Sequence, residues 1–171
     1  MFPFQNRKKV LLSGWALLFL ILFVGVGGNN DAWAESEGVE HRHKIFLFGG
    51  ASQEGSEIDG SLGLGYEYRF TELFGVAGMA EFTSGDIDRS MAFGIGATVH
   101  PYKGLYFLIG PGFEVVDPEH EDREELFLFR IGVGYDFELT PRWSLAPEFN
   151  VDFVSGGETT LVYGLVLGYA F

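Results

Sequence analysis

Strict two-residue alternation is the feature of this sequence that most limits its fold. In residues 160–171, large apolar side chains occupy every second position and small residues stand between them. The large ones are Leu161, Tyr163, Leu165, Leu167, Tyr169 and Phe171, and the small ones are Val162, Gly164, Val166, Gly168 and Ala170. Successive side chains of a strand point to opposite faces, so each set lines one face. Neither face carries the polar residues of a strand that meets water on one side.

The same alternation occurs in seven earlier segments, so the sequence predicts eight strands and no helix in that region. We expect the strands near residues 43–51, 60–70, 74–83, 91–101, 105–116, 126–139, 143–154 and 160–171. The first is apolar on both faces, which leaves its register open. Tight turns such as PYKGLY and LTPRW alternate along the chain with more polar connections such as DPEHEDREE. This alternation of turns and loops is typical of an up-and-down transmembrane barrel.

Two all-β architectures fit this pattern, and they differ in which face is inside. In a soluble lipocalin-like barrel, the large apolar side chains would fill the interior. An eight-stranded barrel is just wide enough for side chains to fill it, and roughly five large residues from every strand would not fit. With the large face against lipid, the Gly, Ala and Ser face leaves room for a few long ionic side chains. We therefore predict the all-β class, as an eight-stranded antiparallel up-and-down transmembrane β-barrel over residues 43–171.

The first 34 residues have the pattern of a secretory signal peptide. A basic start is followed by a long apolar run and then by a small-x-small cleavage site, which is Ala32-Trp33-Ala34. Cleavage between Ala34 and Glu35 would leave a short periplasmic tail at 35–42 before the barrel. The alternative is a retained membrane anchor, because the apolar run is close to the length that spans a bilayer.

Composition excludes several classes of partner and chemistry. The chain has 11 Lys and Arg residues against 24 Asp and Glu residues, a formal net charge of −13. Binding to nucleic acid requires Lys and Arg against the phosphates, so a nucleic-acid partner is not expected. There is no cysteine, and hence no disulfide framework.

Ionic side chains also occur on the small-residue faces, which the predicted barrel turns toward its lumen. They are Glu67, Arg69, Glu81, Glu114, Arg130, Asp136, Glu138, Glu148 and Asp152. Charges buried in a barrel persist only when they are paired or hydrated. A hairpin centred on Pro141 places Arg130 opposite Asp152, and Glu114 should approach Arg130 from the preceding strand. We interpret the set as an ionic plug. A narrow cation-favouring water path is the alternative, because acids outnumber arginines.

The remaining motifs predict no catalytic residue, no cofactor and no dedicated metal site. Recurring Gly-x-Gly pairs do not form a G-x-G-x-x-G that opens a helix, so we interpret them as space for lumen side chains. His41 and His43 make an incomplete metal site. His100 is the histidine expected on a lumen face, and no Ser/His/Asp set is suggested by spacing. The acidic loop 117–125, which contains His120, offers carboxylates to divalent cations. Because the loop lacks the residue spacing of a calcium loop, we expect any such binding to be weak.

The end of the chain resembles that of the small outer-membrane β-barrels, the family of OmpX and of the OmpA transmembrane domain. The residues that carry the resemblance are Tyr163, Leu165, Leu167, Tyr169 and Phe171. It implies that the barrel-assembly machinery recognises this strand, and that the protein lies in the bacterial outer membrane among its lipids and lipopolysaccharide. It also implies short turns in the periplasm and longer loops outside. An aromatic girdle near the periplasmic interface would then contain Tyr102, Tyr106, Trp143, Tyr169 and Phe171.

The resemblance has limits that bear on function. OmpA continues into a peptidoglycan-binding domain, whereas this sequence stops at Phe171, so no such anchoring role is implied. Lipid A deacylases of this size use a His-x-Ser pair on a late strand, and the comparable stretch PEFNVDFVSG contains no His. Lipid A palmitoyltransferases add an amphipathic helix before the barrel, for which 35–42 is too short. We therefore predict a monomeric, non-enzymatic barrel with a structural or surface-interaction role. The alternatives are a narrow cation-favouring pore, a lipid A-modifying enzyme that uses His100, and an adhesin or ligand binder that uses loop 117–125.

Overall fold

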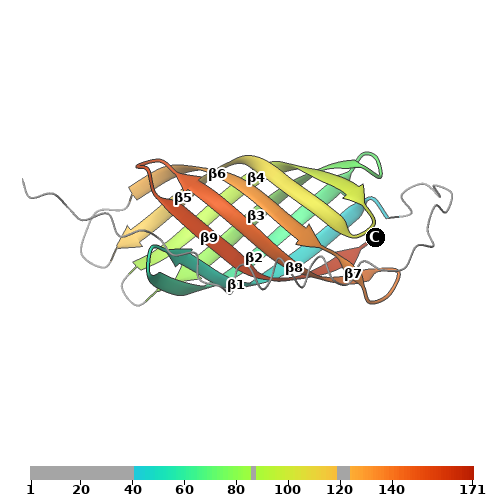
Figure 1. Ribbon diagram of the computed structural model, residues 1–171, viewed down its shortest axis with the longest axis horizontal. Helices are drawn as coiled ribbons and strands as arrows, with labels where there is room; N and C mark the ends of the chain where they lie inside the picture. The colour runs from blue at the N-terminus through green and yellow to red at the C-terminus, as the bar shows by residue number, and fades with distance from the viewer. Residues whose placement is uncertain (1–40, 86–87, 119–123) are drawn as a thin grey trace, which may run out of the picture. The chain divides into compact units, whose positions relative to one another are not determined.

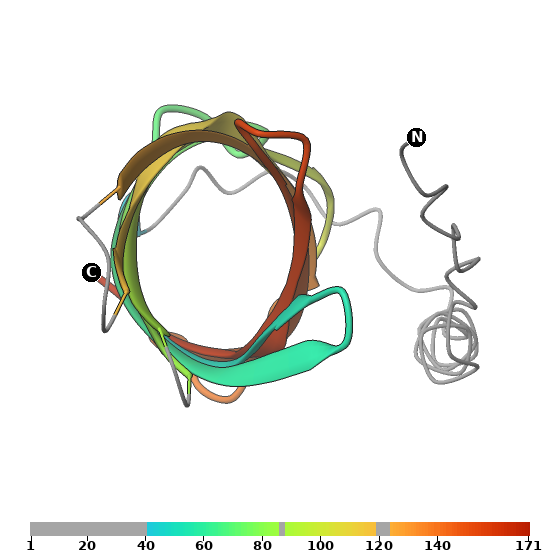
Figure 2. The same ribbon diagram turned by 90° about the vertical axis from the view of Figure 1, so that its left-hand side faces the viewer.

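The computed structural model describes residues 41–85, 88–118 and 124–171. Their strands form one antiparallel sheet that closes on itself, because β1 pairs both with β2 and with the last strand, β9 (Figures 1 and 2). The strands are β1 His43–Glu54, β2 Glu57–Arg69, β3 Phe74–Ser84, β4 Asp88–Tyr102, β5 Leu105–Pro118, β6 Glu124–Tyr135, β7 Phe137–Glu138, β8 Trp143–Val154 and β9 Thr159–Ala170. The predicted signal peptide and its cleavage site at Ala34 and Glu35 lie outside the described residues. No helix among the described residues is long and apolar enough to span a membrane.

β6 and β7 together occupy one position in the wall, so the barrel has the predicted eight strands. Gly134 of β6 pairs with Glu148, and Phe137 of β7 pairs with Leu145, which is the same register on both sides of Asp136. At the interruption, the Asp136 N–H donates to the Gly104 carbonyl at 2.7 Å, which continues the register of Leu105 with Tyr135 by one residue. The prediction of an eight-stranded antiparallel barrel is confirmed.

The two ends of the barrel differ in their connections. At the short-turn end, where Phe171 also lies, the turns after β2, β4 and β7 are tight (Figure 1). At the loop end, the connections follow β1, β3, β5 and β8. One expectation for the loop end is wrong. Residues 52–59 lie between the first two expected strands, but most of them belong to β1 and β2, and only Gly55 and Ser56 connect these strands. Gly55 has a φ of 56°, a left-handed conformation that allows this two-residue reversal.

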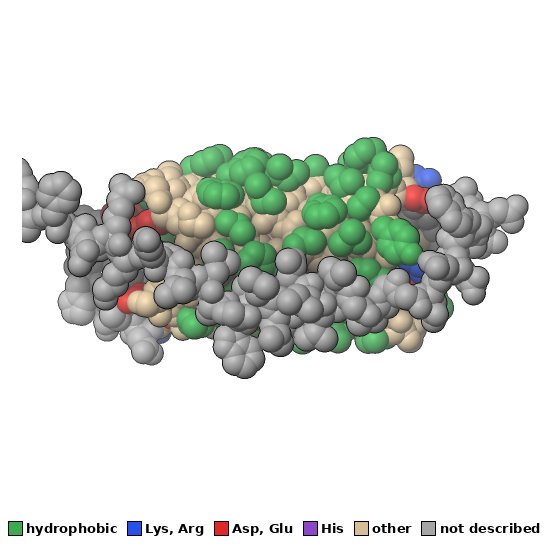
Figure 3. All heavy atoms as spheres, in the orientation of Figure 1, with side chains coloured by type: hydrophobic (Ala, Val, Ile, Leu, Met, Phe, Trp, Pro, Cys, Tyr) green, Lys and Arg blue, Asp and Glu red, His purple; other side chains and the backbone are tan. Residues whose placement is uncertain are grey.

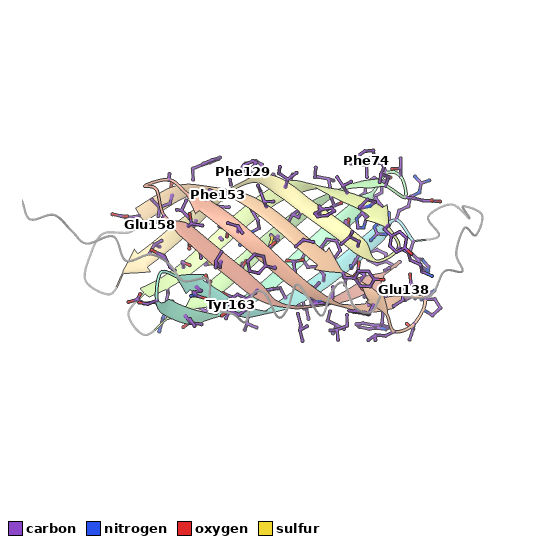
Figure 4. All side chains as sticks on the ribbon, viewed as in Figure 1. Phe74, Phe129, Glu138, Phe153, Glu158 and Tyr163 are labelled. Atoms are coloured by element: carbon purple, nitrogen blue, oxygen red, sulfur yellow. The ribbon has the colours of Figure 1, made fainter. Side chains whose placement is uncertain are left out.

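The outer wall of the barrel is apolar over its length. Figure 3 shows hydrophobic side chains across the visible wall between the two ends, and Figure 4 shows Phe74, Phe129 and Phe153 pointing outward. Leu62 and Ile95 are 68% and 61% exposed, values that are unfavourable for large aliphatic side chains in water. The large face is therefore outside, as predicted, and closure leaves no unpaired strand edge along the wall in contact with lipid.

The interior is fuller than the sequence suggests, because it holds large apolar side chains as well as ionic ones. Phe48 and Tyr106 are buried there with Ala146, Val162 and Val166, and Phe46 packs against this cluster. Inward-facing glycines make the room. A Cβ on Gly65 would overlap the ring of Phe46, and a Cβ on Gly134 would overlap the ring of Tyr106. The open register of the first strand is thus settled: Phe46 and Phe48 face inward, and Ile45 and Leu47 face outward.

Candidate functional site: the ionic lumen

Arg130 of β6 is the centre of an ionic cluster buried in the lumen. Its Nε donates to Asp152 Oδ1 at 2.6 Å and its Nη2 donates to Asp152 Oδ2 at 2.5 Å, a bidentate pair. Its Nη1 donates to Glu81 Oε2 at 2.8 Å. Asp152 lies on the neighbouring strand β8 in direct register with Arg130, as predicted, whereas Glu81 lies on β3, three strands away around the sheet. The cluster therefore connects β6 and β8 with β3 across the lumen.

Glu114 does not belong to this cluster, so its predicted approach to Arg130 is wrong. The residue opposite Arg130 on β5 is Gly110, and Glu114 lies four residues nearer the loop end, opposite Leu126. Four residues of strand span roughly 13 Å, which is beyond the reach of the two side chains. The Glu114 side chain forms no hydrogen bond or ion pair with any described residue. Glu81, which reaches across the lumen, takes the position that the sequence assigned to Glu114.

A second cluster lies nearer the short-turn end and centres on Asp136. Lys44 Nζ is 2.7 Å from both Asp136 carboxylate oxygens, and Ser144 Oγ donates to Oδ1 at 3.0 Å. Arg69 is looser, with Nη2 3.7 Å from Asp136 Oδ2 and Nε 3.6 Å from Glu67 Oε2. The sequence interpretation missed Lys44. Its place on the inward face of β1 was the available signal, but the register of that strand was open.

Glu67 and Glu148 each contact polar side chains in the same half of the lumen. Thr98 Oγ1 donates to Glu67 Oε1 at 2.6 Å, and His100 Nε2 lies 2.6 Å from the same oxygen. The Tyr106 hydroxyl donates to Glu148 Oε2 at 2.5 Å, and Asn150 Nδ2 donates to Oε1 at 2.9 Å. These polar partners of the carboxylates were not predicted.

Two further predictions are wrong. Tyr106 is 7% exposed and points into the lumen, so it is not part of an aromatic girdle on the outer wall. Its even position on β5 shares a face with Leu108 and Gly110, which also line the lumen. Glu138, which was expected in the lumen, is exposed on β7 at the short-turn end (Figure 4) and has no ionic partner among the described residues. The barrel wall ends there, so nothing encloses its side chain.

The space left between the two clusters is small. A cavity of about 50 Å³ is lined by apolar side chains such as Phe46, Met79 and Leu128, and by Arg130 and Glu148. A water molecule needs about 10–15 Å³ by this measure, so the cavity has room for only a few. The ionic side chains and the aromatic residues thus fill most of the cross-section.

Aromatic side chains surround the outside of the barrel at the short-turn end. His43 and Phe171 exchange backbone hydrogen bonds of 3.2 and 2.8 Å, and their rings stack with centroids 5.5 Å apart. Trp143 packs against Tyr169 at 4.9 Å, and Tyr102 is exposed. The expected belt is therefore present without Tyr106. His43 Nδ1 is 2.5 Å from the Tyr66 hydroxyl, so its partners are aromatic residues. Among the described residues, no group of three or more His, Cys, Asp and Glu is arranged to hold a metal ion.

Two predicted interactions, cation binding by the acidic loop and recognition of the last strand by the assembly machinery, stay predictions. Residues 119–123 of the acidic loop, with His120, lie outside the described residues, so its binding of divalent cations stays a prediction. Tyr163, Leu165, Leu167 and Phe171 face outward on or just after β9, as the alternation predicts. Whether the barrel-assembly machinery recognises them also stays a prediction.

Comparison with solved structures shows the same fold at low sequence identity. The N-terminal β-barrel domain of Pseudomonas aeruginosa OprF aligns with a TM-score of 0.59 at 14% identity, covering 79% of this chain and 100% of that chain. Neisserial surface protein A gives 0.58 at 10% identity, covering 80% and 100%. Ail, the attachment invasion locus protein of Yersinia pestis, gives 0.55 at 17% identity, covering 78% and 100%. No family model matches the sequence, and no curated protein matches it significantly.

These three structures have the same barrel fold as this chain. Each of the three is covered completely, so this chain contains the whole of their barrel. The wall, its apolar outer face and its ionic interior all belong to the architecture in which strands cross a membrane. The chain has the fold of the small outer-membrane β-barrels, the group that it resembles in sequence through OmpX and the OmpA transmembrane domain.

Proposed function

We propose that this chain is an integral protein of the bacterial outer membrane whose closed barrel acts as a structural scaffold and exposes its loop end at the cell surface. The observation that carries the proposal is the blocked lumen. Arg130 is bound to carboxylates on two walls, Lys44 is bound to Asp136, and about 50 Å³ remains between these clusters. A solute path would need these bridges to open.

The cost of opening supports a permanent plug. Breaking a buried ion pair by removing one partner costs about 3–5 kcal/mol, because the remaining charge is left unpaired away from water. Arg130 has two such partners, and all three side chains are buried. Movement of Arg130 out of the lumen would leave Asp152 and Glu81 facing each other without a cation.

Single-channel recording of the refolded protein in a planar bilayer at high salt tests this proposal. We expect a silent membrane from protein whose folded state is verified by heat-dependent migration on SDS gels. Reproducible conductance steps from the folded protein would contradict the closed scaffold.

A narrow cation-favouring pore is the second candidate, and the charge of the lumen favours it. Among the described lumen residues that form side-chain hydrogen bonds or ion pairs, five acids, Glu67, Glu81, Asp136, Glu148 and Asp152, face three cations, Lys44, Arg69 and Arg130. An excess of carboxylates favours cations over anions in a pore. The same recordings separate the candidates, since a pore of this kind would show cation-selective steps that diminish as the carboxylates become protonated.

Enzymatic activity on lipid A has less support. His100, the expected catalytic histidine of that alternative, faces the lumen and contacts Glu67 rather than the lipid-facing wall. A lipid substrate would have to enter the filled interior to reach it. We therefore propose a non-enzymatic role, which an unchanged lipid A mass spectrum in cells that overproduce the protein would support. A new lipid A species that disappears in the H100A variant would overturn it.

The charges of the two ends support the proposed orientation. At the loop end, the exposed acids Glu54, Glu57, Glu124, Glu125 and Glu158 outnumber the one described cation, Arg89. At the short-turn end, the exposed cations Arg42, Lys103 and Arg142 outnumber the exposed acids Glu72 and Glu138. An acidic end suits an outer surface where divalent cations link anionic groups. We place the short turns and Phe171 in the periplasm.

A further inference from the structure

The outer wall carries a groove over β2, β3 and β4 in the half of the barrel nearer the loop end. The groove has a volume of about 280 Å³ and is open to the outside. Its apolar lining consists of Leu62, Leu64, Ala80, Phe82 and Met91. In the sheet, Leu62 pairs with Phe82 and Leu64 pairs with Ala80, so the groove runs along β3 beside a ridge formed by the two leucines.

Small residues on β3 create the groove. Ala80 forms part of its floor, and Gly78 is the next outward-facing residue along the strand. A Cβ added to Gly78 would meet nothing closer than the Gly94 carbonyl at 3.9 Å, so the surface there is open. The flanking leucines project far, with Leu62 68% and Leu64 59% exposed. The shape is that of a shallow apolar groove against which a flexible hydrocarbon chain can lie.

A positively charged side chain, Arg89, lies at the loop-end side of this groove. Arg89 lies two residues beyond Met91 on the same outward face of β4, a separation of roughly 7 Å, and it pairs in register with Ser84. Its side chain is exposed and forms no hydrogen bond or ion pair with a described residue. In the part of the loop end that the structure describes, Arg89 is the sole Lys or Arg among acidic residues. In the sheet, Arg89 is in register with Asp117 of β5 on its other side.

We propose that the groove and Arg89 together form a docking site for a phosphorylated glycolipid of the lipid A type. One acyl chain lies along Ala80 between Leu62 and Phe82, and a lipid phosphate accepts hydrogen bonds from the Arg89 guanidinium. The inference rests on the orientation proposed above, which puts Arg89 at the headgroup level of the outer leaflet. It goes beyond a general lipid-facing wall, because it assigns one place on the barrel at which the chain and the phosphate bind together.

Binding of purified lipid A to the delipidated protein in detergent, followed by native mass spectrometry, tests the site. Phosphatidylglycerol, which also carries a phosphate, is the comparison lipid. We expect one tightly bound lipid A, with affinity lowered roughly fivefold in R89Q. In A80F, whose ring fills the groove, we expect a loss of roughly tenfold because about two methylene groups of the chain lose their contact.

Matched variants separate this site from general attraction to the barrel. K103Q removes the same charge at the short-turn end, and A97L enlarges an exposed outward-facing residue of β4 away from the groove. Both should bind lipid A as the unchanged protein does. The proposal is overturned if R89Q and A80F bind normally, if K103Q weakens binding as much as R89Q does, or if phosphatidylglycerol binds equally well. Because this assay does not involve conductance, its failure would leave the closed-barrel proposal standing.

Discussion

Arg130 and Asp152 lie opposite each other on β6 and β8, joined by two hydrogen bonds inside a barrel whose outer wall is apolar. Glu81 of β3 accepts a hydrogen bond from the same guanidinium, so Arg130 also joins the pair to a strand across the lumen. This geometry links a local hairpin contact to a contact across the lumen, and so connects the stability of the wall with the closure of the interior.

The first prediction concerns Arg130. R130A should lower the free energy of unfolding by about 3–5 kcal/mol, because it leaves Asp152 and Glu81 buried without a cation. Urea-induced unfolding of the refolded protein in lipid vesicles measures the loss. R142A, which removes an exposed arginine at the short-turn end, should cost less than about 1 kcal/mol. Equal effects of the two variants would show that the Arg130 cluster contributes no more to the free energy of unfolding than an exposed arginine does.

The second prediction separates Glu81 from Glu114. E81Q should destabilise the protein by about 1–3 kcal/mol, because it weakens a buried charge-assisted hydrogen bond to Arg130. E114Q should change stability by no more than about 0.5 kcal/mol, since Glu114 has no ionic partner among the described residues. The same unfolding measurement compares them. A larger effect of E114Q would restore the original assignment of Glu114 to the cluster.

The third prediction concerns the glycine that lies under Tyr106. G134A should destabilise the barrel by about 1–3 kcal/mol, because its Cβ would overlap the Tyr106 ring and strain the hydrogen bond to Glu148. G60A is the control, since a Cβ at Gly60 would meet nothing within 4 Å. Stability is again read from unfolding in urea. If G134A were as stable as G60A, the close fit of the ring against β6 would be disproved.

The fourth prediction tests the orientation. The chain contains no cysteine, so single cysteines can be labelled without background. In intact cells, a membrane-impermeant maleimide should label S56C, in the exposed β1–β2 turn, and should leave K103C unlabelled until the outer membrane is opened. The reverse pattern would place the short turns outside, and would remove the basis for an outer-leaflet site at Arg89.

The sequence alone determined the wall of the barrel and part of its register. A strand turns alternate side chains to opposite faces wherever it lies, so the alternation separated the two faces of the wall. The limited interior of an eight-stranded barrel then decided that the face with the large residues is outside. A tight hairpin constrains its own register, so the distance of Arg130 and Asp152 from Pro141 was sufficient to pair them. Both inferences depend on residues that are neighbours along the chain or across one turn.

The tertiary structure alone decided which side chains meet across the lumen. Contacts such as Arg130 with Glu81 and Lys44 with Asp136 join strands that are not neighbours in the sheet. The positions of these side chains along the barrel axis depend on the tilt and stagger of the strands around the closed barrel. No local sequence pattern encodes that tilt and stagger. For the same reason, the sequence assigned Glu114 to the cluster, whereas the barrel geometry put Glu81 beside Arg130. The assignment of Tyr106 to the outer girdle was a different error, because its even position on β5 already places it on the lumen face, where it donates to Glu148.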